Sequence, residues 1–401
     1  MSAEPRGRSV LRQRDVGLIA SAVGLSALGD WLALVPLALH LQEQSGSGLV
    51  LSGLLIALWA PVVVLAGPAG LIVDRLETRR VLLVVSLGQA AVAAGLAFAD
   101  GTVLILALTT LLGVGFAVAQ PAEFALVPAV AREERLTEVN GHVETARFAG
   151  MALGPVLGGL LSAVGGMQLA LLLNALTFVA VAAAAGVLRA RRAPVVRDES
   201  APPDRARDGI VFLAREAVLA VVVGVSFVSL LFMTASAPAE VFFARDFLDA
   251  GDFGYGLLMA SWMCGMAIGA LVVARRVGRA SLALGALVAI VVQSAGLAVP
   301  TLWLVLAFAI GFYFVGGVAH GTKNVLIRTL IHERVPDRLR GRTFAAYNGV
   351  RNGAELVALL GGGVLVSTIG ARWTLLLAGA VPAAVGLLAL APARRRLAKV
   401  G

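Results

Sequence analysis

Long apolar stretches recur along this chain from one end to the other, and each is long enough to cross a lipid bilayer as a helix. About 20 apolar residues span the hydrocarbon core in helical form, and unpaired backbone groups are not tolerated there. Hydrophobic residues make up 59% of the 401 residues and charged residues only 14%, whereas soluble globular proteins contain about 25% charged residues. This composition excludes a water-soluble surface and predicts an all-α integral membrane protein.

The hydropathy pattern predicts twelve transmembrane helices. They are expected over residues 16–41, 49–73, 81–99, 102–124, 138–163, 167–188, 217–239, 255–274, 281–299, 301–322, 343–366 and 372–391. A polar segment rich in proline and charge, residues 189–209, divides them into two sets of six and is typical of a flexible linker. We therefore expect an N-terminal half over residues 1–188, this linker, and a C-terminal half over residues 210–401.

Two pairs of segments about 200 residues apart are weakly similar. AQPAEFALVPAV (119–130) matches AHGTKNVLIRTL (319–330), and GPVLGGLLSAVG (154–165) matches LLGGGVLVSTIG (359–370). Each match alone is at chance level, but both fall in register with the hydropathy pattern. They favour two repeated six-helix halves, and parallel repeats of this kind recur in secondary transporters.

Arginine is concentrated before the first expected span and after every second span, whereas the alternate loops hold only Arg245 and Arg372. By the positive-inside rule, both termini and the linker are expected in the cytoplasm. The same distribution accounts for the net charge of +9 without a nucleic-acid partner. The strong preference for arginine over lysine is typical of a GC-rich bacterial genome, so we expect the bacterial cytoplasmic (inner) membrane.

Enzymatic and metal-binding signals are missing from the sequence. The four histidines have no metal-ligand spacing, and the single Cys264 excludes an internal disulfide. GGVAHGTK (316–323) departs from the phosphate-binding loop, which requires Gly-Lys followed by Ser or Thr. We expect no cofactor, no metal and no enzymatic activity, so uphill transport would draw on an ion gradient.

Residues 141–159, GHVETARFAGMALGPVLGG, place charges, a proline and several glycines inside an apolar span. The pattern G-x8-G-x3-G-P-x2-G-G is matched without a departure by Gly141, Gly150, Gly154, Pro155, Gly158 and Gly159. This stretch resembles the antiporter motif in the fifth helix of drug–proton antiporters of the major facilitator superfamily. The antiporters usually carry an arginine in span four, at the position of Thr109 here, so the proton handling attributed to that arginine does not carry over.

A second motif lies between the expected second and third spans. Gly70, Asp74, Arg75 and Arg79 resemble the superfamily's loop motif G-x-L-a-D-R-x-G-R-K-x-x-L, although Glu77 replaces the second glycine and Thr78 the next basic residue. LGDWLALVPLAL (28–39) and VPDRLRGRTF (335–344) resemble the branch that holds macrolide efflux pumps, siderophore exporters and lysophospholipid transporters.

The resemblance covers nearly the whole chain and implies the major facilitator fold, with two pseudo-symmetric six-helix bundles. It implies a secondary transporter that works by alternating access, as a monomer, with a small-molecule or lipid-like substrate, protons and membrane lipids as partners. Proton-coupled efflux of an amphipathic or lipophilic compound is the favoured function. A lysophospholipid or lipid flippase of the same fold is the alternative, and a transporter-like membrane sensor is a third.

The resemblance also implies that helices 1, 4, 7 and 10, with parts of 5, 8 and 11, line the transport cavity. The polar residues expected there are Asp30, Glu144, Arg147, Glu240, Asn348, Arg351 and Glu355. Asp30 is the favoured proton-coupling carboxylate, because no basic residue lies within a turn of it and desolvation disfavours its charged form. Three alternatives stay open: a structural role for Asp30, a structural role for the two ion pairs, and an arginine that reaches Asp30 from another helix.

A gate is expected at the cytoplasmic side. Glu123 and Lys323 are expected to end spans four and ten and to pair when that side is closed, while Asp74 would approach the start of the eleventh helix. Gly150, Gly154 and Gly158 form a strip of small residues, expected to meet Ser261, Gly265 and Gly269 of span eight. Tight packing of each strip within its own half is the alternative.

Overall fold

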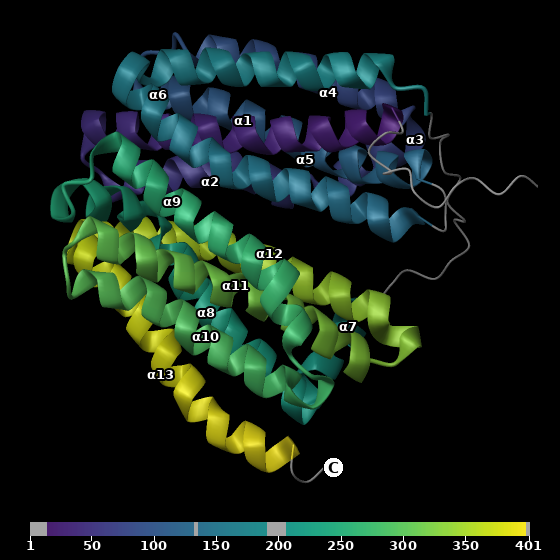
Figure 1. Ribbon diagram of the computed structural model, residues 1–401, viewed down its shortest axis with the longest axis vertical. Helices are drawn as coiled ribbons and strands as arrows, with labels where there is room; N and C mark the ends of the chain where they lie inside the picture. Colours follow the sequence, from purple (N-terminus) through teal and green to yellow (C-terminus); the bar gives the residue numbers. More distant parts are fainter. Residues whose placement is uncertain (1–13, 132–134, 191–205, 398–401) are drawn as a thin grey trace, which may run out of the picture. The chain divides into compact units, whose positions relative to one another are not determined.

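The computed structural model describes residues 14–131, 135–190 and 206–397, and regular structure within these ranges is helical (Figure 1). The first helices in chain order are α1 (Arg14–Ser45), α2 (Gly48–Val64), α3 (Ala66–Arg75), α4 (Thr78–Leu96), α5 (Thr102–Val130) and α6 (Leu136–Val187). They are followed by α7 (Ala206–Arg215), α8 (Ala217–Phe242), α9 (Gly251–Ile268), α10 (Leu282–Ala298), α11 (Leu306–Arg334), α12 (Asp337–Ile369) and α13 (Ala371–Leu397). Short π-helical segments, Phe243–Phe247 and Gly269–Val273, continue α8 and α9.

The described helices account for the twelve expected spans. Nine of these helices are long and apolar enough to cross a membrane, and α2 with α3 forms a tenth span that is bent by 55°. The 52-residue α6 contains two of the expected spans. Helix α11 is not among the nine membrane-crossing helices, because polar and charged residues occupy its second half. The expectation of an all-helical membrane protein is confirmed.

Two helix breaks have identifiable causes in the sequence. Gly166 interrupts α6 with φ 67° and ψ −172°, a conformation that glycine adopts without the steric cost of a Cβ atom. The break between α2 and α3 lies at Leu65, three residues before Pro68. Because proline has no N–H, Pro68 cannot donate to the carbonyl of Val64, and its ring crowds that carbonyl. These residues turn continuous apolar runs into separate helical segments.

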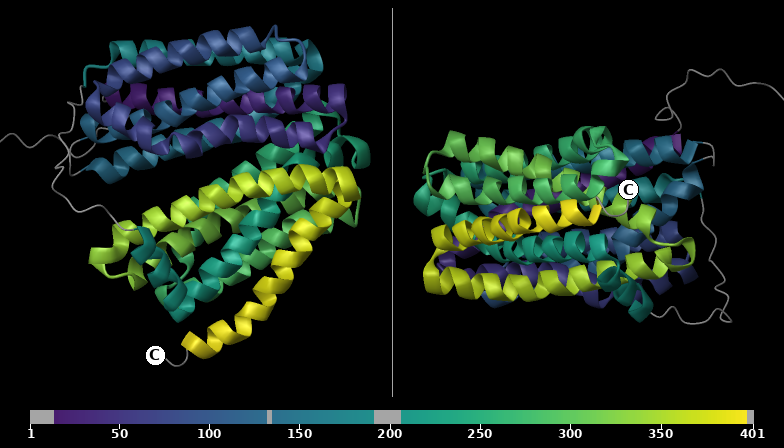
Figure 2. Two further views of the ribbon diagram at one scale, coloured as in Figure 1. Left: turned by 180° about the vertical axis from the view of Figure 1, so that it is seen from behind. Right: turned by 90° about the horizontal axis from the view of Figure 1, so that it is seen from below.

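The chain forms two compact units. Unit 1 comprises Met1–Leu37 and Ala57–Glu199, and unit 2 comprises Ala38–Ile56 and Ser200–Gly401. Within each unit the long helices pack side by side as a bundle (Figure 2). Helix α7 begins at Ala206, inside the segment expected as a flexible linker, so the last residues of that segment are helical; residues 191–205 lie outside the described ranges.

The glycine strip of α6 faces α1. A Cβ atom on Gly150, Gly154 or Gly158 would lie closer to the backbone of α1 than such atoms ever approach, and at Gly154 and Gly158 the distance to the Leu28 and Leu32 carbonyl oxygens would be 2.7 Å. In unit 2, Gly265 and Gly269 face the α11 backbone at Phe314 and Val318 in the same way. The glycines of each strip therefore pack against a helix of their own unit, which is the alternative that the sequence left open.

A similar close contact between helix backbones occurs in each of the two units. Gly158 of α6 meets Leu32 of α1 in unit 1, and Gly362 of α12 meets Ala235 of α8 in unit 2. In both cases a glycine allows two backbones to approach within a distance that any side chain would prevent. The repeat seen weakly in the sequence corresponds to a repeated helix pairing, which agrees with two pseudo-symmetric bundles.

The close contact between α1 and α6 predicts a stability difference between two glycines of the same motif. Gly150→Ala should lower the thermal unfolding temperature of the detergent-purified protein, since the added methyl group would meet the α1 backbone. Gly141→Ala is the matched control, because a Cβ atom there meets nothing within 4 Å. Alanine is favoured over glycine by about 1 kcal/mol in a helix, so this variant should be as stable as the parent or more stable. Equal stability of the two variants would contradict the packing argument.

Candidate functional site

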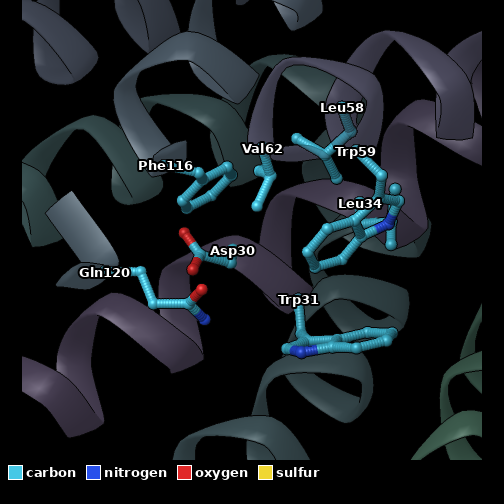
Figure 3. Close-up of a pocket in the computed structure, with 8 residues that line it drawn as sticks. All are labelled: Asp30, Trp31, Leu34, Leu58, Trp59, Val62, Phe116 and Gln120. Carbon is cyan, nitrogen blue, oxygen red and sulfur yellow. The ribbon is translucent and has the colours of Figure 1, made fainter. Parts of the chain in front are cut away.

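A small pocket within unit 1 surrounds the carboxylate of Asp30. Helices α1, α2 and α5 each contribute residues four positions apart, which lie on one face of a helix. The lining residues are Asp30, Trp31, Leu34, Leu58, Trp59, Val62, Phe116 and Gln120. The cavity volume is about 70 Å³. Figure 3 shows the Asp30 carboxylate extending toward Phe116 and Gln120, with the indoles of Trp31 and Trp59 on its other side.

The Asp30 carboxylate is incompletely satisfied. Its Oδ1 atom is buried and has no hydrogen-bond partner among the described residues. Two charged groups are near enough to act on it electrostatically, Glu123 of α5 and Arg147 of α6. The basic neighbour therefore comes from another helix, as one of the alternatives for Asp30 allowed.

Arg147 is the centre of a charged cluster in unit 1. Its Nη2 lies 3.7 Å from Glu123 Oε2, and its Nε lies 3.6 Å from Glu144 Oε1. The guanidinium also lies over the ring of Phe124, 4.6 Å from the centroid, a cation–π arrangement. The side chains of Arg147 and Glu123 are only 16% and 5% exposed, so the pair is largely desolvated. With Asp30 the cluster holds three carboxylates and one guanidinium.

Glu123 and Lys323 do not end their helices. Helix α5 continues from Glu123 to Val130, and α11 continues from Lys323 to Arg334. Both residues are buried, with 4% and 3% of their total surface exposed. The helical backbone thus continues beyond the expected span ends at these two charges.

A second polar cluster lies in unit 2. Arg351 Nη2 donates to Glu355 Oε1 at 2.8 Å, four residues further along α12. Lys323 interacts electrostatically with both of them, and His320 lies one helical turn before Lys323. The His320 ring meets the edge of Trp262, with 5.7 Å between ring centroids. The sequence did not identify His320 as a candidate, although its three-residue spacing from Lys323 puts both on one face of α11.

The other residues expected in the cavity occupy different surroundings. Asn348 is exposed on α12. Glu240 lies near the end of α8, partly buried and close enough to Tyr255 and Tyr313 for electrostatic interaction. The structure thus brings Asp30, Glu123, Glu144 and Arg147 together in unit 1. It gives Glu240 a separate position in unit 2.

The loop motif joins helix ends in unit 1. Arg79 Nη1 donates to the carbonyl oxygen of Leu188 at 2.6 Å, so the start of α4 is tied to the end of α6. Glu77, which stands where the superfamily motif has glycine, lies 2.7 Å from Arg80 Nε. Asp74 is half-buried and Arg75 is exposed. Gly70 is half-buried with open space in its Cβ direction.

A helical membrane protein with ionisable groups buried in its spans has the features of a transporter, since such groups mark substrate and ion pathways. No group of His, Cys, Asp and Glu in the described ranges is arranged to hold a metal ion. Residues 19–359 match the family model of the Major Facilitator Superfamily, and the chain belongs to this superfamily of transporters.

Known proteins of this superfamily resemble the chain over nearly its whole length. It is 24% identical over 393 residues to the "Uncharacterized MFS-type transporter YfiS" of Bacillus subtilis (strain 168), covering 94% of this chain and 93% of that protein. A POT family transporter in complex with a thioalcohol-conjugated peptide has a TM-score of 0.73 at 12% identity, covering 95% of this chain and 96% of that chain. A mutant of the nucleoside transporter NupG has a TM-score of 0.69 at 13% identity, covering 96% of this chain and 99% of that chain. At these identities the solved structures establish the shared fold alone.

The Arg147 cluster predicts that removing the arginine alone is worse than removing a charge pair. Arg147→Met should lower the unfolding temperature strongly, because breaking a buried pair from one side costs about 3–5 kcal/mol. Glu123→Gln added to Arg147→Met should recover part of that loss. Arg135→Met is the control, because Arg135 lies 3.0 Å from Glu138 in an exposed pair of the kind usually worth at most about 1 kcal/mol. A double variant no more stable than Arg147→Met would contradict this account.

Proposed function

We propose that this protein exports an amphipathic or lipophilic small molecule in exchange for protons by alternating access. The observation that supports this proposal most is the environment of the Asp30 carboxylate. It belongs to a membrane-spanning helix and lies in a pocket with aromatic walls, and its buried Oδ1 atom has no hydrogen-bond partner among the described residues. A carboxyl in such surroundings favours its neutral form, so it can take up a proton from one side and release it on the other.

The proton gradient supplies enough free energy for this work. One proton crossing about 100 mV of membrane potential provides about 2.3 kcal/mol. At about 1.4 kcal/mol per factor of ten, this supports roughly a fiftyfold substrate gradient. A pH difference across the membrane adds to that driving force, so coupling to one proton is sufficient for efflux.

Asp30 is assigned the proton, with Glu123, Glu144 and Arg147 modulating its charge. Arg147 favours the ionised form of Asp30 and Glu123 opposes it, so conformational changes that move Arg147 would change proton affinity. In unit 2, Arg351, Glu355, Asn348 and Glu240 are proposed to line the substrate path. None of these residues needs a cofactor for such a role.

The loop motif and two buried charges are assigned to the conformational change. We propose that Gly70, Asp74, Arg75 and Arg79 act with Glu123 and Lys323 to bias one state over the other. Arg79 ties the start of α4 to the end of α6, so a shift at the loop would be passed first to the segment of α6 that follows Gly166. Only contacts that differ between the states can shift their balance.

Asp30→Asn should abolish efflux driven by a pH gradient in liposomes, because the amide keeps the shape of the carboxyl and cannot titrate. Substrate binding and folding should be largely retained. Asp100→Asn is the control, since Asp100 is exposed just after α4. If the Asp30 variant still concentrates substrate with unchanged pH dependence, the proton site lies elsewhere, and Glu144 is the next candidate. Transport by the parent protein that ignores the pH gradient would favour a lipid flippase.

We also propose that the protein lies in the bacterial cytoplasmic membrane with both termini inside, an orientation that the arginine distribution supports. In a variant with Cys264→Ala, single cysteines at Ser45 and Ala250 should react with a membrane-impermeant maleimide added to whole cells. A cysteine at Ser200, which lies outside the described residues, should react only after the membrane is made permeable. External labelling at position 200 would overturn this orientation.

A further inference from the structure

Positive charge exceeds negative charge in the second polar cluster, the one in unit 2. Lys323 on α11 and Arg351 on α12 act on each other electrostatically, and Glu355 is the one carboxylate that acts on Lys323 among the described residues. Glu355 already accepts a hydrogen bond from Arg351 Nη2 at 2.8 Å. Lys323 is 3% exposed, so water screens its charge poorly. One positive charge of this cluster therefore remains uncompensated.

The excess charge indicates which ligand the cluster suits. Ionisable groups inside membrane proteins are costly to bury and usually pair with one another. Two cationic groups and one carboxylate leave a single positive charge, which a singly charged anion would neutralise. Ammonium and guanidinium groups donate charge-assisted hydrogen bonds to carboxylate and phosphate oxygens, and these are among the strong hydrogen bonds. The cluster therefore suits a singly charged oxyanion.

The surface of α12 next to Arg351 is open. The Arg351 side chain is 37% exposed, and Asn348, one helical turn earlier, is exposed as well. Gly349 and Gly353 stand two residues before and after Arg351, and both are exposed with open space in their Cβ directions. No side chain at these two glycine positions blocks an anion that approaches the guanidinium.

Aromatic rings lie beside the charged groups. The rings of Phe227 on α8 and Tyr347 on α12 have centroids 5.8 Å apart. Tyr347 lies four residues before Arg351, on the same face of α12, and interacts electrostatically with it. An apolar surface thus adjoins the cationic groups. Such a combination fits an amphiphile whose head group is acidic.

We propose that Lys323 and Arg351 form a subsite for a singly charged oxyanion of the substrate, a carboxylate or a phosphodiester, which makes the transported compound an acidic amphiphile. The inference rests on the proposed function and specifies its substrate class. Glu355 holds the Arg351 side chain and neutralises one of the two cations. Because the proton is assigned to Asp30 in unit 1, substrate and proton do not compete for one residue. Their coupling then depends on the change between conformational states.

The test measures binding without any gradient. Radiolabelled octanoate is added at neutral pH to the purified protein in phosphatidylcholine nanodiscs, and octanamide serves as the uncharged control of the same shape. We expect octanoate to bind saturably and octanamide to displace it about tenfold more weakly, since hydrogen bonds to charged groups are stronger than those to neutral ones. Equally strong displacement by octanamide would overturn the proposal without any mutation.

Variants locate the site. Lys323→Met should weaken octanoate binding about tenfold, and Lys323→Arg, which restores the charge, should recover most of it. Arg275→Met is the matched control, because it removes the same charge from an exposed position in unit 2 and should bind octanoate like the parent. Parental affinity in Lys323→Met would overturn the assignment.

A stability measurement separates binding from a structural role of the lysine. Lys323→Met keeps the ion pair of Arg351 with Glu355 and removes the repulsion between Lys323 and Arg351. Without ligand, this variant should therefore unfold at the same temperature as the parent or at a higher one. A clearly lower unfolding temperature would show that Lys323 stabilises the fold, and it would contradict the uncompensated charge on which the proposal depends.

Competition identifies the source of the oxyanion. Decanoate represents a free acid, and lysophosphatidylglycerol represents a lipid with a phosphodiester. Displacement of octanoate by either supports the subsite and names the source, whereas equally strong displacement by an uncharged monoacylglycerol would overturn it. A protein that binds octanoate in this way without proton-driven transport would refute the proposed coupling and leave the subsite standing. Proton-driven efflux of a cationic compound that octanoate does not inhibit would have the opposite consequence.

Discussion

The charge of Arg147 inside the membrane is the constraint around which unit 1 is arranged. A charged side chain at mid-membrane depth costs about 2.5–3.5 kcal/mol on insertion scales, so it persists only with partners. Arg147 has Glu123 on α5, Glu144 one turn earlier on α6, and the ring of Phe124 beneath its guanidinium. These contacts fix the relation of α5 to α6. Arg147 and Glu123 also interact electrostatically with Asp30 on α1.

Backbone contact makes that electrostatic relation possible. Gly24 of α1 faces the carbonyl of Ala146, the residue before Arg147, and Gly150 faces Gly24 in return. With no Cβ atom on either glycine, the two helices approach closely enough for Arg147 to act on a carboxylate of α1. The glycine motif and the charged residues within it are therefore parts of one arrangement. The glycines allow the two helices to approach closely enough for their charged groups to interact.

The sequence predicted the helices well because their signals are local. Apolar runs of about 20 residues act on their own stretch of chain, although the break at Leu65 inside the expected span 49–73 was not predicted. It could not predict which face of α6 meets α1, because nearly every face of a membrane helix is apolar and no polarity difference marks the inner side. The rings of Trp31, Trp59 and Phe116 were not recognised as pocket residues for the same reason. Their surroundings come from helices distant in the chain.

The repeated arginines show how two similar bundles acquired different chemistry. Arg147 on α6 and Arg351 on α12 each lie a few helical turns before a glycine that contacts the backbone of another helix of the same unit, Gly158 and Gly362. The residue buried on the neighbouring helix is acidic in unit 1, Glu123, and basic in unit 2, Lys323.

The sign reversal has a consequence for proton coupling. In unit 1, carboxylates outnumber the cationic groups around Arg147. In unit 2, Glu355 is the only carboxylate among the described groups that act on Arg351 and Lys323. Glu355 is already bound to Arg351 at 2.8 Å, so protonating it would break an ion pair. Protonating Asp30 breaks no such pair and relieves its repulsion with Glu123. This difference supports the proposal that the proton binds in unit 1 and that the basic cluster of unit 2 lines the substrate path.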